Sequence, residues 1–484
     1  MTRKGIAMVS AALTDLPRFG YILGMPDSAI ARFFKFREKG TNVRTEVLGG
    51  ATTFVTMAYI IVVNPAILSF AGIPQGPSTV ATILAAAFGS LLMGLYANRP
   101  LAVAPYMGEN AFIAFGLAAM GIGWQLRLGA VFVSGLVFAL ITLLRVRSWL
   151  ANSISPSLKH SFAVGIGLFL AFIGLYETGI VTSAAAGMAP EALLKGGPLL
   201  SAPDVPLKIG NLHSPQVLLA VLGFVLISVL LHFRVRGGIL LGIAATAGLG
   251  YVLGLGEAPR AVAALPFRGE FSLAPIALKL DIAGVLRLSF LPILLTLFLM
   301  GFLDTLGTLV GVGAAGGMLD EKGNFKGIER PMMVDAATCV FSSLVGTSTS
   351  GAYIESATGI REGARTGLAA VTTAALFAAS LFFIPLVQPL QHLRYAYGPA
   401  LIAVGVLMLG SIRNIDFGDM TELVPAFATI VVMVFTYNVA NGLTAGLVLW
   451  PAFKALTGRF REIRAGAVVL GLLCLVYFVF GLPH

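Results

Sequence analysis

Three carboxylates stand in stretches of this chain that are otherwise free of charge. Glu109 occurs in "APYMGENAF", Asp304 in "GFLDTLGTLVG" and Glu355 in "TSTSGAYIESATGI". In the hydrocarbon of a membrane, an unpaired charge costs roughly 2.5–3.5 kcal/mol on insertion scales. If these stretches lie at membrane depth, binding a substrate or taking up a proton is therefore the default explanation for such acids.

The residues beside these acids suit a flat, neutral heterocycle. Asn110 follows Glu109 and offers both a donor and an acceptor. Carboxylate oxygens accept the N–H groups of a ring, helix N–H groups donate to its carbonyl, and aromatic faces stack on it. The aromatic residues near the acids are Tyr106, Phe112, Phe115 and Tyr353. An anion would instead favour Arg or Lys, and neither "APYMGENAF" nor "TSTSGAYIESATGI" contains one.

Each of these residues also has a purely structural interpretation. Glu355 could cap the N-terminus of a short helix. Asp304 could be a buried acid hydrogen-bonded to neighbouring Thr residues, whereas left unpaired it could carry a proton. For Glu109 the two interpretations are balanced, and each aromatic ring taken singly is a packing residue. Other acids are expected nearer segment ends: Glu46, Glu177, Asp335 and Asp416.

The composition places these residues in a polytopic membrane protein. Of 484 residues, 57% are hydrophobic and only 11% are charged, whereas about a quarter are charged in soluble proteins. Apolar runs near the roughly 20 residues that cross a bilayer recur from Val47 onward. The first 44 residues are polar and basic, so no short cleavable signal is expected. The net charge of +10 is spread through loops, which argues against a nucleic-acid partner.

Fourteen principal segments are predicted, and they divide into two sets of seven. The first set is 45–70, 78–97, 105–119, 127–147, 160–179, 216–233 and 237–256. The second set is 289–313, 333–347, 352–361, 365–387, 398–412, 420–438 and 440–457. A further apolar stretch, 465–482, either spans the membrane or lies at its interface. Most Lys and Arg residues fall on one side in this arrangement, and the positive-inside rule places that side and the N-terminus in the cytoplasm.

The two sets resemble each other in sequence. "VRGGILLGI" (235–243) is similar to "VANGLTAGL" (439–447), and "GENA" (108–111) is similar to "IESA" (354–357). An odd number of spans per repeat inverts the second copy, as in transporters whose substrate binds between the repeats near the midplane. The third and tenth segments begin with an extended stretch and continue with only a short helix, so neither spans continuously. Their helix N-termini are expected to point into a shared space.

Sequence motifs of nucleotide-binding proteins and enzymes are either absent or lie in the wrong structural context. "GVGAAG" (311–316) ends a predicted membrane helix rather than following a strand, so a dinucleotide site is not expected. No G-x-x-x-x-G-K-[ST], Ser-His-Asp or H-E-x-x-H pattern occurs, and Cys339 and Cys474 have no metal-binding or disulfide spacing. His160 and His232 are expected at helix ends. The chain is thus predicted to be neither an ATPase nor an enzyme, and to use no cofactor beyond a proton gradient.

Several stretches resemble one family of transporters. They are "GTNVRTEVLGGATTFVTMAYIIVVNPAIL", "APYMGENAFIAFG", "GIGLFLAFIGL", "FLDTLGTLVGV" and "YIESATGIREGARTGL". In this order they are similar to the AzgA-like branch of the nucleobase permeases, which carry adenine, guanine and hypoxanthine. The resemblance covers about Phe33 to Lys454. It implies an all-α, UraA-like fold of 14 segments, a 7+7 inverted repeat with short strands before half-helices 3 and 10.

The resemblance also divides the chain into domains. Proteins of this fold move substrate by displacing a core domain against a gate domain, often as dimers. The implied boundaries are 45–147 and 289–387 for the core, 160–256 and 398–457 for the gate, 1–44 for a cytoplasmic N-terminal segment, and 465–482 for an added C-terminal segment. A multi-pass protein of the cytoplasmic membrane, in contact with lipid and able to form a homodimer, is therefore expected.

Site residues carry over from the family one by one. Glu355 matches a substrate-binding glutamate, Asn110 a binding asparagine, and Asp304 a proton-coupling aspartate. The residues expected beside them in the substrate site are Phe112, Ala352, Tyr353 and Ser356. Family members often carry a second acid at the position of Gly301 and an apolar residue at that of Glu109. We hypothesise that Glu109 takes over part of the missing acid's role, in both substrate binding and proton coupling.

These observations predict a proton-coupled symporter that imports a purine nucleobase: guanine, hypoxanthine or adenine. Asp304 would take up the proton, alone or coupled with Glu109 and Glu355. The alternative on the same fold is a transporter of uracil, xanthine or an organic anion, although an anion would lack a basic partner. A passive channel should show polar stripes through several full-length spans, and a membrane enzyme should show a catalytic constellation. Neither pattern occurs.

Overall fold

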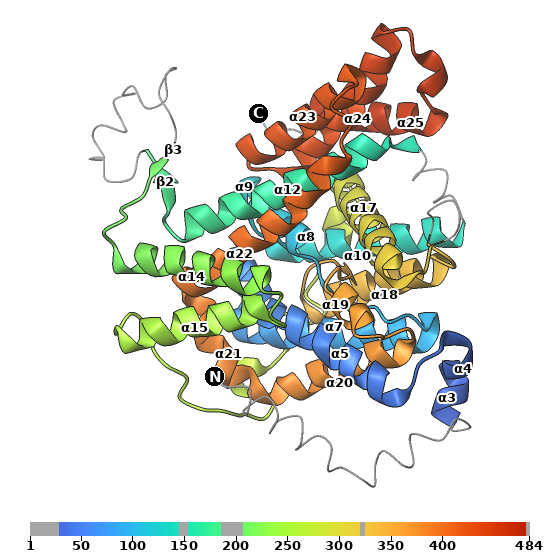
Figure 1. The fold of residues 1–484 in the computed structure, drawn as a ribbon. Coiled ribbons are helices and arrows are strands. Elements are labelled where there is room, and N and C mark those ends of the chain that lie inside the picture. Colours follow the sequence, from blue (N-terminus) through green and yellow to red (C-terminus); the bar gives the residue numbers. More distant parts are fainter. Residues whose placement is uncertain (1–28, 145–152, 185–206, 320–324, 481–484) are drawn as a thin grey trace.

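The computed structural model describes residues 29–144, 153–184, 207–319 and 325–480 (Figure 1). Three expectations lie partly outside these residues: the N-terminal segment up to residue 28, the end of the fourth segment at 145–147, and the last positions of the C-terminal stretch, 481 and 482. Within the described ranges, nine helices are long and apolar enough to cross a membrane, and shorter apolar helices occur beside them.

Helices occupy the positions predicted for the first seven segments. They are α5 (Val43–Met57) continued by α6 (Ile60–Ser69), α7 (Gln75–Leu92) continued by η1 (Met93–Ala97), α8 (Met107–Ala111) continued by η2 (Phe112–Gly116) and α9 (Leu117–Ala119), α10 (Trp124–Leu143), α12 (Pro156–Glu177), α14 (Pro215–His232) and α15 (Gly238–Val252). Two short helices, α3 (Ala29–Phe33) and α4 (Phe36–Lys39), precede them. Strands β2 (Val181–Ser183) and β3 (Leu207–Ile209) pair antiparallel between α12 and α14.

The second seven predicted segments are helical as well. They are α17 (Leu291–Gly316), α18 (Glu329–Val345), α19 (Ser356–Arg361), α20 (Gly367–Ser380) followed by α21 (Ile384–Val387), α22 (Arg394–Leu409), α23 (Met420–Phe435) and α24 (Val439–Leu456). A short helix, α16 (Ile282–Val285), comes before α17. The added C-terminal stretch forms α25 (Ala465–Phe480), which packs against α24.

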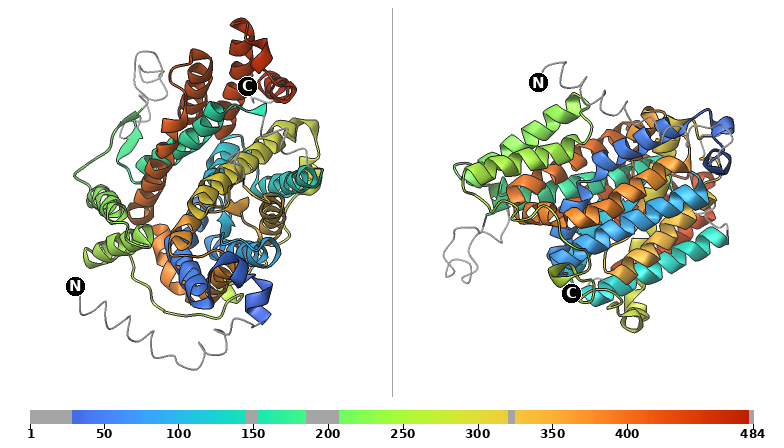
Figure 2. Two further views of the ribbon diagram at one scale, coloured as in Figure 1. Left: turned by 45° about the vertical axis from the view of Figure 1, so that its right-hand side comes forward. Right: turned by 90° about the horizontal axis from the view of Figure 1, so that it is seen from below.

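Helices from the two halves of the chain lie against one another (Figure 2). α5 and α7 pack on α20, α10 packs on α18, and α12 packs on both α22 and α23. α19 comes especially close to α5, since a Cβ on Gly359 would lie 2.3 Å from the carbonyl oxygen of Gly49. Only glycine permits two backbones to approach so closely. This contact places the short helix α19 beside the first segment.

The third and tenth segments begin with short strands, as predicted, and the structure shows that these two strands pair with each other. β1 (Val103–Pro105) and β4 (Ser350–Ala352) are antiparallel, with Ala104 opposite Gly351. Beyond the ladder, the N–H of Tyr106 donates to Thr349 O (2.9 Å), and that of Tyr353 donates to Ala102 O (2.9 Å). Backbone groups within a membrane require such partners, because hydrocarbon supplies none. The ladder therefore allows extended chain at this depth and sets the starting points of α8 and α19.

The first segment is interrupted and then held by a residue from far along the chain. Pro65 in α6 has no N–H, so it cannot donate to the carbonyl of Ile61 one turn earlier. Gln391 supplies the missing donor, since its Nε2 lies 3.0 Å from Ile61 O and 2.8 Å from Thr79 Oγ1. The connection between α21 and α22 is thereby fastened to α6 and α7.

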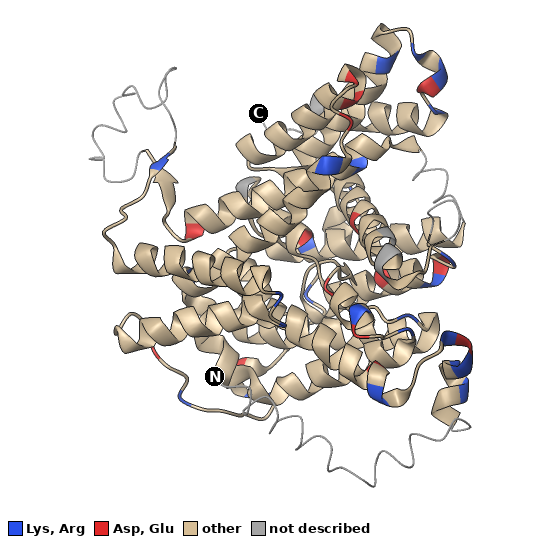
Figure 3. Cartoon of the chain, in the orientation of Figure 1, with Lys and Arg blue, Asp and Glu red and all other residues tan. Residues whose placement is uncertain are grey.

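Charged residues lie mainly at helix ends and in connecting segments, and long stretches of helix contain none (Figure 3). The outer surfaces of α14 and α15 are apolar instead, with Leu218, Leu222, Val225, Leu241 and Leu249 exposed. An apolar exposed surface of this extent is expected for helices surrounded by lipid. The acids inside the helical bundle are exceptions to this pattern and are described below.

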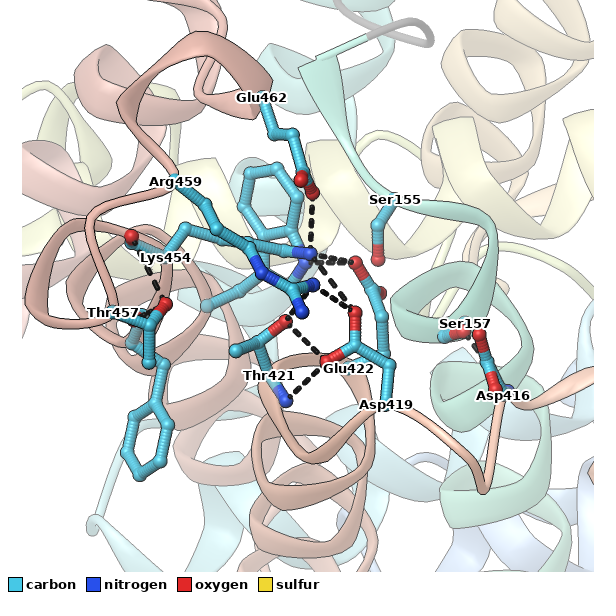
Figure 4. Close-up of polar contacts among 12 residues, drawn as sticks. Ser155, Ser157, Asp416, Asp419, Thr421, Glu422, Lys454, Thr457, Arg459 and Glu462 are labelled. Carbon is cyan, nitrogen blue, oxygen red and sulfur yellow. Dashed lines mark hydrogen bonds and ion pairs between the residues drawn. The ribbon is translucent and has the colours of Figure 1, made fainter.

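Five charged side chains join the ends of α23 and α24 (Figure 4). Lys454 is 1% exposed, and its Nζ lies 2.6 Å from Glu462 Oε2 and 3.1 Å from Glu422 Oε1. The same Nζ lies 3.4 Å from Asp419 Oδ2, which also pairs with Arg459. We refer to these five residues as the Lys454 cluster.

Further polar contacts complete the Lys454 cluster. The backbone N–H and the hydroxyl of Thr421 both donate to Asp419, at 2.9 and 2.7 Å. These hydrogen bonds, together with Arg459 and Lys454, hold the pKa of Asp419 well below its usual range. Trp450 donates its Nε1–H to Glu422 (2.9 Å). Lys454 is thus the buried cation around which three carboxylates are arranged.

Candidate functional site

The predicted site residues gather around the β1–β4 ladder. The rings of Tyr106 and Tyr353, one beyond the end of each strand, are nearly parallel, with centroids 6.5 Å apart. The Tyr353 hydroxyl donates to Pro105 O, and the Tyr106 hydroxyl lies 2.8 Å from Thr305 Oγ1 on α17. Both tyrosines are buried. They connect the start of each half-helix to the opposite strand or to α17, which carries Asp304.

Glu355 directly precedes α19, yet its side chain does not cap the helix. The capping interpretation raised from the sequence is therefore wrong. Instead, Tyr59 donates its hydroxyl to Glu355 Oε1 (2.8 Å) from the interruption between α5 and α6. Glu355 is partly exposed, and its Oε2 has no hydrogen-bond partner within the described part of the chain. One carboxylate oxygen is thus fixed by the protein while the other is open to a ligand.

Glu109 is fully buried, and both of its carboxylate oxygens lack a hydrogen-bond partner among the described residues. A Cβ added at Gly301 would lie 3.9 Å from Glu109 Oε1. The glycine of α17 therefore faces the acid of α8, and Asp304 stands one turn further along α17. The geometry brings Glu109 to the place from which a side chain is missing at Gly301, although its part in transport stays a prediction.

Asp335 is a site residue that the sequence interpretation missed. It was expected near a segment end, but it is fully buried in α18. Its Oδ2 accepts hydrogen bonds from the N–H of Ala352 (3.1 Å) and the hydroxyl of Thr305 (2.9 Å). The available signal was a single acid in the apolar run "MMVDAATCVF", which itself contains no Lys or Arg. Asp335 joins α17 and α18 to β4 close to the tyrosine pair.

The remaining predicted residues have backbone or packing contacts. Ser356 accepts the N–H of Ala102 (3.0 Å), so its hydroxyl extends the ladder. Ala352 belongs to β4, where Asp335 accepts its N–H. Phe112 is completely buried at the start of η2. Asn110 donates its Nδ2 to Asn64 Oδ1 (2.7 Å), a partner in α6 that the sequence interpretation did not single out. Contact of any of these residues with a substrate stays a prediction.

The arrangement has a definite chemical character. Acceptor oxygens without partners belong to Glu109, Asn110 and Asp335, and Glu355 offers a further one. Within the described residues, no ion pair involves these acids, since the ion pairs found all lie elsewhere. Buried acceptors without partners are costly unless a donor or a proton reaches them. The site is therefore built to receive N–H donors, protons, or both.

Comparisons with known proteins show which family the chain resembles. A model of the permease family matches residues 44–444. Adenine permease AdeP of Escherichia coli is 39% identical over 452 residues, which are 93% of this chain and 96% of that protein. Guanine/hypoxanthine permease PbuO of Bacillus subtilis is 36% identical over 447 residues, which are 91% of this chain and 98% of that protein.

A solved structure shows the same fold. The transmembrane domain of a cyanobacterium bicarbonate transporter, BicA, aligns with a TM-score of 0.59 at 17% identity and covers 83% of this chain and 97% of that chain. At this identity the likeness concerns the fold alone. It confirms the predicted UraA-like inverted repeat, in which short strands precede two half-helices.

Proposed function

The chain belongs to the permease family, a family of transport proteins rather than enzymes, and from this membership we propose that it imports purine nucleobases together with protons. The names of the relatives, which include adenine and guanine/hypoxanthine permeases, support the substrate class. The observation that carries the proposal is Glu355, whose Oε1 is held by Tyr59 while its Oε2 has no hydrogen-bond partner among the described residues.

The proposed binding mode follows from the open acceptors. Glu355 Oε2 accepts an N–H of the base, and the amide of Asn110 accepts a second. An anion does not suit this site, because within the described residues no Lys or Arg forms an ion pair with its carboxylates and like charges repel. A purine would be bound by the ends of both half-helices, so that its binding depends on α8 and α19 together.

Proton coupling is proposed through Asp304, with Glu109 and Glu355 as coupled partners. Three carboxylates close to one another at membrane depth repel one another and are costly to keep ionised. A proton taken up from the outer side, together with the base, would remove part of that charge before the core domain moves. The proposed core domain is supported by a set of helices that pack on one another: α5, α7, α10, α17, α18, α19 and α20. The proposed gate domain is supported by the packing of α12 on α22 and α23.

Reconstituted transport tests the proposal. Purified protein in proteoliposomes should accumulate labelled hypoxanthine or guanine when an inward proton gradient is imposed, with the gradient collapsed by a protonophore as the control. Unlabelled adenine, guanine and hypoxanthine should compete, whereas uracil and small organic anions should not. Concentrative uptake that continues without the gradient would refute proton coupling. Competition by uracil or an anion in place of purines would refute the substrate class.

Replacement of Glu109 by Gln should reduce uptake by about tenfold or more, because Gln keeps the size of the side chain but cannot exchange a proton. Both oxygens of Glu109 lack partners, so the change removes no hydrogen bond of the described structure. Uptake in proteoliposomes measures the effect. Glu257→Gln is the matched control, because Glu257 is an exposed acid that pairs with Arg260. Uptake at the wild-type rate by Glu109→Gln would remove Glu109 from the coupling mechanism.

A further inference from the structure

Asn64 lies in a chain of buried hydrogen bonds whose direction can be worked out. The hydroxyl of Thr82 donates to the carbonyl of Ser78 one turn earlier in α7 (2.7 Å). A hydroxyl has one hydrogen, so Thr82 Oγ1 can only accept from the amide of Asn64, 2.7 Å away. The atom of Asn64 that faces Thr82 must therefore be the nitrogen. Its Nδ2 also lies 3.0 Å from Thr347 Oγ1.

The orientation of Asn64 determines that of Asn110. With its nitrogen turned to Thr82, Asn64 presents Oδ1 to the side chain of Asn110 at 2.7 Å. Only the nitrogen of Asn110 can donate to that oxygen, so Asn110 Oδ1 must point away from Asn64. It is buried and has no hydrogen-bond partner among the described residues. An isolated asparagine amide can adopt either orientation. Here the hydrogen bonds from Ser78 O through Thr82 to Asn64 select one orientation for Asn110.

We propose that Thr82 and Asn64 are positioning residues that keep Asn110 as a hydrogen-bond acceptor and so require the substrate to present an N–H at that point. The inference rests on the proposed function, since it concerns how the same site selects its base. Neither positioning residue touches the substrate. They act through Asn110, and the ligand class they favour is a neutral base with an N–H donor at the edge that meets it.

The orientation has a consequence for selectivity. A flipped Asn110 would present an N–H₂ donor at this point and would then favour a base with an acceptor there, such as a ring nitrogen. If Asn110 flipped, its oxygen would face Asn64, and Asn64 would have to flip as well to offer a donor. Asn64 Oδ1 would then face Thr82 Oγ1, whose single hydrogen is already donated to Ser78 O. Two acceptor oxygens would meet without a hydrogen between them, so Thr82 opposes the flip. A fixed acceptor discriminates strongly, because a ligand without the donor leaves a buried group unpaired.

Thr82→Val tests the inference, because it keeps the side-chain shape and removes the hydroxyl that selects the orientation. Four unlabelled compounds, hypoxanthine, adenine and their 7-deaza forms, compete with the uptake of labelled hypoxanthine in proteoliposomes. Hypoxanthine and adenine differ in the donors and acceptors of the six-membered ring, and the 7-deaza forms lack a ring nitrogen of the five-membered ring. The ratios of their half-inhibitory concentrations should change by about tenfold in Thr82→Val. Thr82→Ser should restore the wild-type ratios. Thr338→Val is the matched control, since Thr338 is buried and its hydroxyl donates only to Val334 O.

Asn64→Ala provides a second route to the same change, because it removes the oxygen acceptor of Asn110 Nδ2 and leaves that nitrogen only the sulfur of Met107 at 3.8 Å. It should shift the ratios as Thr82→Val does. Folded variants in which the half-inhibitory concentrations of all four competitors change by the same factor would overturn the inference, since a merely structural defect does not alter selectivity. If the wild type takes up no purine, the proposed function itself fails. If the wild type transports and both variants keep its ratios, only the positioning role fails.

Discussion

Replacement of Glu355 by Gln is expected to reduce purine uptake by about a hundredfold without unfolding the protein. Tyr59 donates to one oxygen of the carboxylate, and Gln can accept that hydrogen bond with its own oxygen. Its N–H₂ group then occupies the place of the open oxygen. A donor of the protein would face the N–H donor of the base, which repels it instead of binding it. Uptake per molecule of reconstituted protein measures the loss.

Tyr59→Phe is the control for Glu355→Gln. It removes the donor to Glu355 Oε1 but leaves both carboxylate oxygens able to accept. We therefore expect a smaller loss, about tenfold or less, because a typical hydrogen bond contributes only about 0.5–1.5 kcal/mol. If Glu355→Gln transports as the wild type does, Glu355 does not bind the base. If Tyr59→Phe is the more damaging change, the role of Glu355 is structural.

Replacement of Lys454 by Met should lower the free energy of unfolding by about 3–5 kcal/mol. The side chain is 1% exposed, and its removal leaves Asp419, Glu422 and Glu462 close together without their central cation. Arg459 remains, but within the described residues its ion pair is with Asp419 rather than with Glu422 or Glu462. Denaturant titration of the protein in detergent, followed by helical circular dichroism, measures the change.

Lys35→Met is the matched control for the effect of Lys454. Lys35 pairs with Glu38 at 3.3 Å, but both side chains are more than half exposed. Exposed pairs contribute about 0–1 kcal/mol, so this variant should unfold almost as the wild type does. Equal destabilisation by the two changes would show that the Lys454 cluster does not hold α23 and α24 together. Lys454→Arg should retain much of the stability, because it keeps the charge.

The sequence was sufficient to predict the fold because membrane burial leaves strong marks. Each span needs a long apolar run, and the two exceptions stood out by their polar, glycine-containing starts. The short strands before the third and tenth helices were implied by the family resemblance, whereas the pairing of β1 with β4 is seen only in the structure. Glu109, Asp304 and Glu355 were recognisable because charge is rare in such surroundings.

The partners of these residues could not be predicted in the same way. Tyr59 and Asn64 lie in the run "MAYIIVVNPAIL", where nothing distinguishes them from packing residues. Their contacts with Glu355 and Asn110 depend on how α6 meets α8 and α19 in space. The sequence could place Glu355 at the start of a helix, but it could not predict that the side chain turns toward Tyr59 instead of capping that helix. Asp335 was expected near the end of its segment because it lies close to the start of the apolar run. In the structure α18 begins at Glu329, so Asp335 lies well inside the helix and is buried.

The β1–β4 ladder also bears on how the protein is made. Its two strands come from opposite halves of the chain, so β1 is synthesised long before β4 exists. Until the second half has been inserted, the carbonyl of Ala102 and the N–H of Tyr106 lack the backbone partners, Tyr353 and Thr349, that they have in the finished protein. The nascent first half must therefore keep this segment in water or against other protein. Assembly of the binding site is consequently a late event, completed only when α19 reaches α5.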